Sequence, residues 1–428
     1  MAASLGLWLL MSGCQLAVQR PYSYEYVRFD DIVPSYLTLT QSWNALGVDD
    51  QDRVYIIWTS KRDDGREDAA LFRYARATGS RAFLGTFIDV ATAQHNLLAG
   101  EEIPKGHTRI LQIGRKLYMA SQGFHDFKAE IAGLPKYRGA HLFTYDLDTG
   151  AFDDVSRTFP NGVLIEHQGI VALAYSPEHG LLVGLAHPLG DIVLFDVAQG
   201  TLRNVVSGIP WQLDHAVSRE VVVTRKGKVY TYRGSEDSKW RELANEVWVY
   251  DLATGESKPT GQWLKGGFWN GQAETRDRNT IYLSTVSGEL YVLDVEREIF
   301  SHAGHFIVGA DFRSARQYRV RYLFGISLSA AEDAVLGVPI VAPTMGSELD
   351  ATRSPLTSYS VAEHTFATQL DMDTEVFTGS NHRDSQGNLY MAAFDWNTNC
   401  KLAVLKPPLD PSGAASKSRA GQASRDPR

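Results

Sequence analysis

The sequence predicts an all-β fold, a seven-bladed β-propeller, and two repeated patterns support this prediction. The first is a pair of apolar or aromatic residues that follows a predicted turn, at intervals of roughly 50 to 65 residues, the length of a four-stranded blade with its loops. The second is an alternating strand that ends in an aspartate, as in residues 141–146, 192–196, 247–251 and 290–294. The repeated pairs are Val54-Tyr55, Leu117-Tyr118, Leu181-Leu182, Val229-Tyr230, Ile281-Tyr282, Val335-Leu336 and Leu389-Tyr390.

Composition agrees with one large globular domain. The chain has 428 residues, of which 44% are hydrophobic and 21% charged, so it can bury an extensive core. Blades bury their faces only against neighbouring blades, so the repeats form one domain rather than the two or three that length alone suggests. The expected blades cover about 35–90, 106–157, 166–207, 214–261, 268–303, 306–371 and 375–406.

Ring closure is predicted from the strand that the last repeat lacks. Its third predicted strand ends at Lys406, and prolines and a polar tail follow where the outermost strand should be. Residues 24–29 alternate as a strand does, before the first blade begins. Because an open ring would leave unpaired strand edges, we expect this N-terminal strand to be added to the last blade. The propeller domain is therefore 22–406.

The two ends of the chain differ from the repeats. Residues 1–21 contain a short apolar run, and the segment 10–14, which ends in Cys14, resembles a bacterial lipobox, although no Lys or Arg precedes the run. We expect an exported protein, either a periplasmic or cell-surface lipoprotein whose membrane contact is a lipid anchor on Cys14, or a secreted protein. Residues 407–428 are rich in Pro, Ser, Gly and charge, and we expect disorder there.

Charge limits the classes of partner. The net charge of -8 argues against nucleic acid as a partner. Basic residues nevertheless recur in several predicted loops, for example Lys61, Arg62 and Arg66. They are either solvated loop residues or the cationic rim of a site for a polyanionic ligand. We expect a monomer.

Histidines mark the candidate site. In a propeller the start of the inner strand and the end of the second strand lie on the same face, so residues at these places in successive blades converge at the axis. Imidazole can remove or donate a proton near neutral pH. The candidate catalytic residues are His107, His125, His167 and His187. The candidate substrate-binding residues are Arg138, Arg233, Tyr232, His215, Trp211 and Trp269. The two tryptophans are either stacking platforms for sugar rings or packing residues that cap the blades.

Several chemistries remain open for these residues. A lyase acting on a uronic acid polymer needs a cation for the carboxylate, a base and an acid, which arginine, histidine and tyrosine supply. A glycoside hydrolase needs two carboxylic acids, for which Glu166 and Asp214 are a candidate pair. No cofactor is required, although a divalent metal at His107, His167 and His187 is an alternative. A non-catalytic propeller that binds a glycan or scaffolds an envelope complex is the other class of function.

Blades two and three resemble those of seven-bladed propeller polysaccharide lyases. The segments that carry the resemblance are 106–108, 116–118, 138–146, 169–173 and 184–188. This group includes ulvan lyases and rhamnosyl-glucuronate lyases, with a related propeller rhamnosidase. In those enzymes two histidines from one blade act with a tyrosine and an arginine from the next. The resemblance implies that His107 and His125 are the histidine pair, whereas the tyrosine position falls near His167 and the arginine has no clear counterpart. It implies β-elimination on an anionic, uronic acid-containing polysaccharide.

Overall fold

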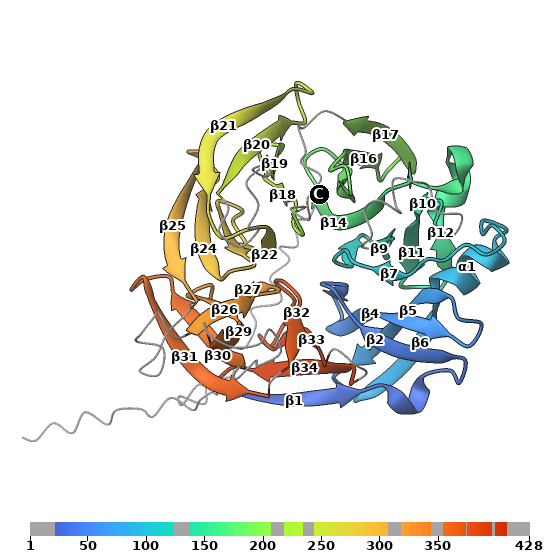
Figure 1. The fold of residues 1–428 in the computed structure, drawn as a ribbon, viewed down its shortest axis with the longest axis horizontal. Coiled ribbons are helices and arrows are strands. Elements are labelled where there is room, and N and C mark those ends of the chain that lie inside the picture. Colours follow the sequence, from blue (N-terminus) through green and yellow to red (C-terminus); the bar gives the residue numbers. More distant parts are fainter. Residues whose placement is uncertain are drawn as a thin grey trace, which may run out of the picture.

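The computed structural model describes residues 22–123, 137–206, 218–233, 244–306, 318–343, 354–373, 375–395 and 399–408. Within them, seven sheets of four or five strands stand around a central axis (Figure 1). The predicted seven-bladed β-propeller is therefore confirmed. Residues 1–21, with the expected lipobox at Cys14, and residues 409–428 of the expected tail lie outside the described residues.

Each blade is an antiparallel sheet, and in the first six blades the strands follow the chain from the axis to the rim. The inner strands of blades one and two are each interrupted. Blade one contains β2 (Leu37–Gln41), β3 (Leu46–Val48), β4 (Arg53–Arg62), β5 (Glu67–Ala75) and β6 (Ser80–Thr86). Blade two contains β7 (Lys105–Gly106), β8 (Leu111–Ile113), β9 (Lys116–Gln122), β11 (Leu142–Asp146) and β12 (Phe152–Asp154). Blade three contains β14 (Gly169–Ser176), β15 (Leu181–His187), β16 (Ile192–Asp196) and β17 (Thr201–Val206).

The remaining blades repeat the same order. Blade four contains β18 (Val222–Val223), β19 (Lys228–Arg233), β20 (Asn245–Asp251) and β21 (Ser257–Leu264). Blade five contains β22 (Trp269–Glu274), β23 (Thr280–Thr285), β24 (Glu289–Asp294) and β25 (Ile299–His305). Blade six contains β27 (Ile326–Leu328), β28 (Ala334–Gly337), β30 (Ser354–Ser360) and β31 (Thr365–Met372). Blade seven contains β32 (Val376–Thr378), β33 (Leu389–Phe394), β34 (Lys401–Lys406) and, from the start of the chain, β1 (Ser23–Arg28).

Several short helices and strands lie outside the seven blade sheets. The helix α1 (Phe87–Ala93) follows blade one and begins after Thr86, whose side chain accepts a hydrogen bond from the Asp89 backbone N–H (3.1 Å). Two small sheets join β10 (Gly139–Ala140) to β13 (Ile165–Glu166) and β26 (Tyr318–Tyr322) to β29 (Ile340–Pro343), and 3-10 helices cover Asp30–Ile32, Val155–Thr158 and Pro160–Gly162. Among the described residues, none of the helices has the length and apolar character needed to cross a membrane.

The repeated sequence patterns correspond to two turns of each blade. All seven repeated pairs lie in the second strand. In blades one and seven the tyrosine of the pair donates its hydroxyl to the aspartate of the preceding turn, Tyr55 to Asp49 (3.2 Å) and Tyr390 to Asp384 (2.7 Å). The aspartate that ends the third strand accepts backbone N–H bonds in the next turn, as Asp146 does from residues 148 and 149 (3.0 and 2.9 Å).

The ring is closed by the N-terminal strand, as predicted. The β1 strand pairs antiparallel with β34, from Ser23 opposite Lys406 to Arg28 opposite Lys401. The following residue, Phe29, is fully buried and packs edge-on against Phe72 of blade one, with ring centroids 5.4 Å apart. Both ends of the described propeller are thus held in one sheet, and the edge of the last blade is covered.

The core lies between blades rather than in a single centre. Each apolar cluster draws side chains from neighbouring sheets; one of them contains Trp58 and Phe72 of blade one with Tyr390 of blade seven.

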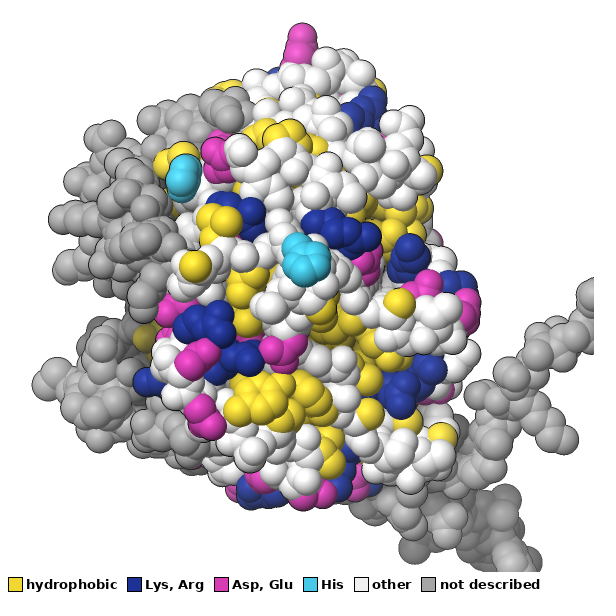
Figure 2. Space-filling view, turned by 90° about the vertical axis from the view of Figure 1, so that its right-hand side faces the viewer, with side chains coloured by type: hydrophobic (Ala, Val, Ile, Leu, Met, Phe, Trp, Pro, Cys, Tyr) yellow, Lys and Arg dark blue, Asp and Glu magenta, His cyan; other side chains and the backbone are white. Residues whose placement is uncertain are grey.

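On the side of the molecule that Figure 2 shows, Lys and Arg side chains are interspersed with Asp and Glu rather than gathered in a stripe. Two of the basic loop residues that could form a cationic rim are in ion pairs: Arg62 pairs with Asp68 and Arg66 with Asp64, each at 2.7 Å.

Candidate functional site

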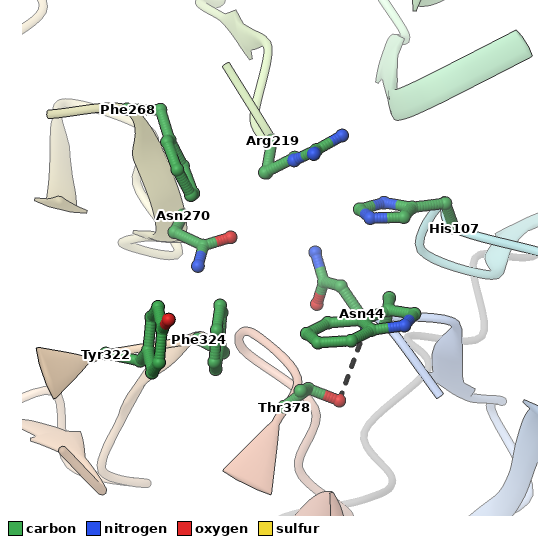
Figure 3. Close-up of a pocket in the computed structure, with 9 residues that line it drawn as sticks. Asn44, His107, Arg219, Phe268, Asn270, Tyr322, Phe324 and Thr378 are labelled. Carbon is green, nitrogen blue, oxygen red and sulfur yellow. Dashed lines mark hydrogen bonds between the residues drawn. The ribbon is translucent and has the colours of Figure 1, made fainter. Parts of the chain in front are cut away.

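A pocket of about 250 Å³ lies where the inner strands meet at the axis (Figure 3). The described residues of its lining come from every blade except the third. Several lining residues occupy breaks in the inner strands: Asn44 lies between β2 and β3, His107 between β7 and β8, and Asn270 at an irregularity of register in β22. Such breaks can turn a side chain out of the sheet, here toward the axis. The lining residues are Trp43, Asn44, His107, Arg219, Phe268, Asn270, Tyr322, Phe324 and Thr378.

The imidazole of His107 is held by a neighbouring blade. Its Nδ1 lies 3.0 Å from the carbonyl oxygen of Val171 in β14. Because a carbonyl oxygen only accepts, Nδ1 carries the hydrogen, and in the neutral ring Nε2 keeps its lone pair. The side chain is buried, and its ring points into the pocket (Figure 3). His107 can therefore accept a proton or a hydrogen bond through Nε2.

Two asparagines are fixed in the same way. The Asn44 Nδ2 donates to the Glu220 carboxylate (3.1 Å), and the Asn270 Nδ2 donates to the Leu323 carbonyl oxygen (3.1 Å). Both side chains are buried, and the Asn270 oxygen points into the pocket (Figure 3). The Asn44 Oδ1 has no hydrogen-bond partner among the described residues.

A buried set of hydrogen bonds, the axial network (Asn44, Arg109, Glu220 and Gln272), supports the pocket. The Glu220 side chain is 2% exposed and accepts hydrogen bonds from Arg109 Nη2 (2.9 Å), Gln272 Nε2 (3.0 Å) and Asn44 Nδ2. These bonds join the inner-strand segments of blades one, two, four and five. The nearby His382 is neutral, because burial and the charge of Arg109 lower its pKa to about 3.

Aromatic side chains form the walls. Trp43 meets Phe324 and Phe394 edge-on, with ring centroids 5.3 and 5.4 Å apart, and Tyr322 stacks on Phe324 at 5.0 Å. The Arg219 guanidinium lies over the Phe268 ring, 5.7 Å from its centroid. The pocket therefore combines apolar walls with one cation, one imidazole and two amide groups.

Of the predicted site residues that the structure describes, only His107 lines this pocket. His187 is buried at the end of β15, and His167 is exposed with a positive φ of 57°. Arg138 donates to Glu101 (3.3 Å) and to the backbone of Asn96 (2.8 Å), and so holds two loops together. None of these three lines the pocket.

Two predicted ligand contacts are core residues, which corrects the sequence-based expectation. Tyr232 and Trp269 are both fully buried and pack against each other with ring centroids 5.3 Å apart. Phe268 and Asn270, on either side of Trp269 in the sequence, line the pocket, whereas the Trp269 ring packs in the interface between two blades. It therefore stabilises the packing between blades four and five and cannot serve as a platform for a sugar.

The other predicted residues are not placed. His125, Trp211, His215 and Asp214 lie outside the described residues, and so does the side chain of Arg233. The second carboxylate of the hydrolase pair, Glu166, pairs with Asn161. Across the described part of the chain, no three His, Cys, Asp or Glu side chains are grouped so that they could hold a metal ion.

Sequence reasoning missed most of the pocket because it followed histidines. Asn270 is the second residue of the inner strand of blade five, and Arg219 and Phe324 stand just before the inner strands of blades four and six. Comparing these inner-strand positions from one repeat to the next, whatever the residue type, would have found them. Tyr322, which precedes blade six in a less regular repeat, leaves no such pattern.

A buried histidine outside the pocket has a structural role. His141 is fully buried between Asp154 (Nδ1 to Oδ2, 2.8 Å) and Glu101 (Nε2 to Oε1, 3.4 Å). Burial alone would lower the pKa of His141, but the two carboxylates outweigh it and raise the pKa. Burial would likewise raise the pKa of Glu101, yet the bond with His141 leaves it lowered. The cluster is thus an ion pair inside blade two.

Comparisons with known proteins bear on the fold. The sequence matches no protein-family model and no curated protein. The structure is similar to the WD40 repeats of RRP9, with a TM-score of 0.55 and 11% identity over 91% of this chain and 99% of that chain. It is also similar to a chain of the mitotic checkpoint complex, with a TM-score of 0.52 and 11% identity over 95% and 99%. The β-propeller domain of Cps50 (Swd1) from Myceliophteria thermophila is similar as well, with a TM-score of 0.50 and 12% identity over 90% of this chain and 99% of that chain. At these identities the similarity shows the propeller fold alone.

Proposed function

We propose that this protein binds an acidic saccharide in the axial pocket and cleaves it by β-elimination. The observation that carries the proposal is that His107 and Arg219, from blades two and four, line one pocket with aromatic walls (Figure 3). A base beside a guanidinium is the combination that proton abstraction next to a carboxylate requires. A volume of about 250 Å³ suits a single sugar ring with its substituents rather than a long stretch of polymer.

Each residue has a defined role in this reaction. Arg219 binds the uronate carboxylate and neutralises its charge, which makes the adjacent C–H bond more acidic. His107 Nε2 takes the proton, the electron pair of that C–H bond forms the C=C bond, and the glycosidic C–O bond breaks. The leaving oxygen needs a proton, and we assign this step to the Tyr322 hydroxyl, the phenol in the pocket lining.

The substrate class follows from the chemistry and from the resemblance of blades two and three. The acidic saccharide is an anionic polysaccharide, or an oligosaccharide derived from it, that contains uronic acid. Export, a lipid anchor on Cys14 and a monomeric state remain predictions from the sequence.

The proposal is tested by incubating the purified full chain with a panel of uronic acid-containing polysaccharides and recording the ultraviolet absorbance of an unsaturated uronate product. His107→Ala and Arg219→Ala should each abolish the signal. The matched control is His302→Gln on the rim strand β25, where the side chain is 52% exposed and bonds Glu289, and this variant should retain full activity. Unchanged turnover in His107→Ala would reject the assignment.

A second candidate function is binding without catalysis. The observation that favours it is the lining itself: of the nine described residues that form it, four are aromatic and His107 is the only histidine. Saturable binding of an acidic saccharide, with no product from any polymer in the panel, would establish this function and exclude the lyase.

A further inference from the structure

We propose that Asn44 and Asn270 determine specificity in the axial pocket by accepting hydrogen bonds from ligand hydroxyl groups. The inference rests on the proposed function, in which the pocket holds an acidic saccharide. It adds that the sugar bound there carries free hydroxyls, neither sulfated nor esterified, at the positions that face the two amide oxygens.

The argument begins with the orientation of the amides. An asparagine can present either an acceptor oxygen or a donor nitrogen to a ligand, and the bonds made by its other atom decide which. The Asn44 Nδ2 is committed to the carboxylate of Glu220 (3.1 Å), and the Asn270 Nδ2 to the Leu323 carbonyl oxygen (3.1 Å). Both of those partners only accept, so a flipped amide would place oxygen against oxygen. Each asparagine therefore presents its oxygen.

The acceptors are buried and held in place. Asn44 is 8% exposed and Asn270 is 7% exposed, and the Asn44 Oδ1 has no hydrogen-bond partner among the described residues. A buried acceptor without a donor is costly, and a ligand that supplies the donor recovers that free energy.

Charge and acceptor pattern together define the ligand class. Among the described residues that line the pocket there is one guanidinium, that of Arg219, and no carboxylate. An anionic ligand is therefore favoured, and its remaining polar groups must be donors to match the amide oxygens. Sulfate or acyl substituents bring only acceptors and would leave the two oxygens unpaired. A uronate with free hydroxyls satisfies both conditions and places its apolar ring faces against the aromatic walls.

The test is calorimetric titration of the full chain with three small probes: methyl β-glucuronide, methyl β-glucoside and cyclohexanecarboxylate. The glucuronide carries both the carboxylate and the hydroxyls, the glucoside lacks the carboxylate, and cyclohexanecarboxylate lacks the hydroxyls. We expect the glucuronide to bind and each of the others to bind at least roughly tenfold more weakly, as expected when buried polar groups lose their partners.

Variants then assign the effect to the asparagine. Asn270→Leu keeps a similar shape but removes the acceptor, so it should weaken glucuronide binding roughly tenfold and leave the weak binding of cyclohexanecarboxylate unchanged. The control is Asn279→Leu, in the turn after the same inner strand, where the amide bonds Asp277 (2.9 Å) outside the pocket. It should bind all probes as the unaltered protein does. The three probes on the unaltered protein decide the question even if Asn270→Leu fails to fold.

Equal affinity for cyclohexanecarboxylate and the glucuronide would overturn the inference, and so would the absence of binding by all three probes. Failure of the proposed function looks different. Selective glucuronide binding without an unsaturated product would leave the hydroxyl selection standing and remove the lyase. Product formation from a polymer, with no discrimination between the two acidic probes, would do the reverse.

Discussion

Glu220 offers the most direct test of how the pocket is supported. In Glu220→Ala the axial network loses its only carboxylate, which leaves the Arg109 guanidinium and the Asn44 amide without their main partner. Gln272 is less affected, because its Nε2 also donates to the Val221 carbonyl oxygen (2.9 Å). In this variant one buried charge and one buried amide therefore lose hydrogen bonds.

The magnitude follows from the burial of these groups. Removing one partner of a buried ion pair costs about 3–5 kcal/mol, because the other charge stays buried. The Arg109 side chain is 15% exposed, and its Nη2 retains the Gln272 carbonyl oxygen at 3.2 Å, so we expect the lower end, about 3 kcal/mol. Glu220→Gln keeps the shape and one acceptor and should cost less, about 1–2 kcal/mol.

The assay is urea unfolding followed by tryptophan fluorescence, with the free energy taken from the midpoint and the slope. The control is Glu256→Ala, an exposed residue in the turn before β21, which should change the free energy of unfolding by less than about 0.5 kcal/mol. The double variant R109M/E220L should be more stable than Glu220→Ala, since no charge remains unpaired. A loss below about 1 kcal/mol in Glu220→Ala would refute the reasoning.

Three further outcomes are expected. A histidine whose pKa is raised on folding contributes stability below its ordinary pKa of 6.5 and loses that contribution as the pH rises through the raised value. The stability difference between the unaltered protein and His141→Gln should therefore shrink as the pH rises above 6.5 in urea titrations, and a constant difference would contradict the assignment. Gly325→Ala should lower the melting temperature by several degrees or prevent folding, because φ is 134° and a Cβ would lie 2.0 Å from the Gly379 carbonyl oxygen; an unchanged melting temperature would show that the inner strands can move apart. Deleting the residues up to Arg28 removes β1 and should expose the edge of β34, giving a lower melting temperature and aggregation on size-exclusion chromatography, whereas a monomer of normal stability would mean that ring closure matters little.

The sequence predicted the fold well because the blade repeat is local. The second strand and the turn before it depend on residues that are close in the sequence, such as Asp384 and Tyr390, six positions apart, so the repeated pairs can be recognised without knowledge of distant contacts. Closure by β1 could be predicted because an unpaired edge is unfavourable, whatever the side chains are.

The site could be predicted only in part, because its residues meet across the axis. Asn44 and Glu220 are 176 positions apart yet share a hydrogen bond, and no local pattern links them. His107 was predicted because histidine is a residue type that can remove or donate a proton. Trp269 was misplaced because alternation along a strand decides which neighbour faces the axis, and the register of β22 is irregular at that point.

The pairing of β1 with β34 also decides how the ring responds to force. Ser23 lies opposite Lys406, so the first and last strands begin and finish at the same corner of blade seven. A force that separates Ser23 from Lys406 would act on the β1–β34 hydrogen bonds one after another rather than on all of them together. The pair resists force least in this direction. The start of β1 and the end of β34 are therefore better suited to attachment at one surface than to a linkage that carries tension between two separate structures.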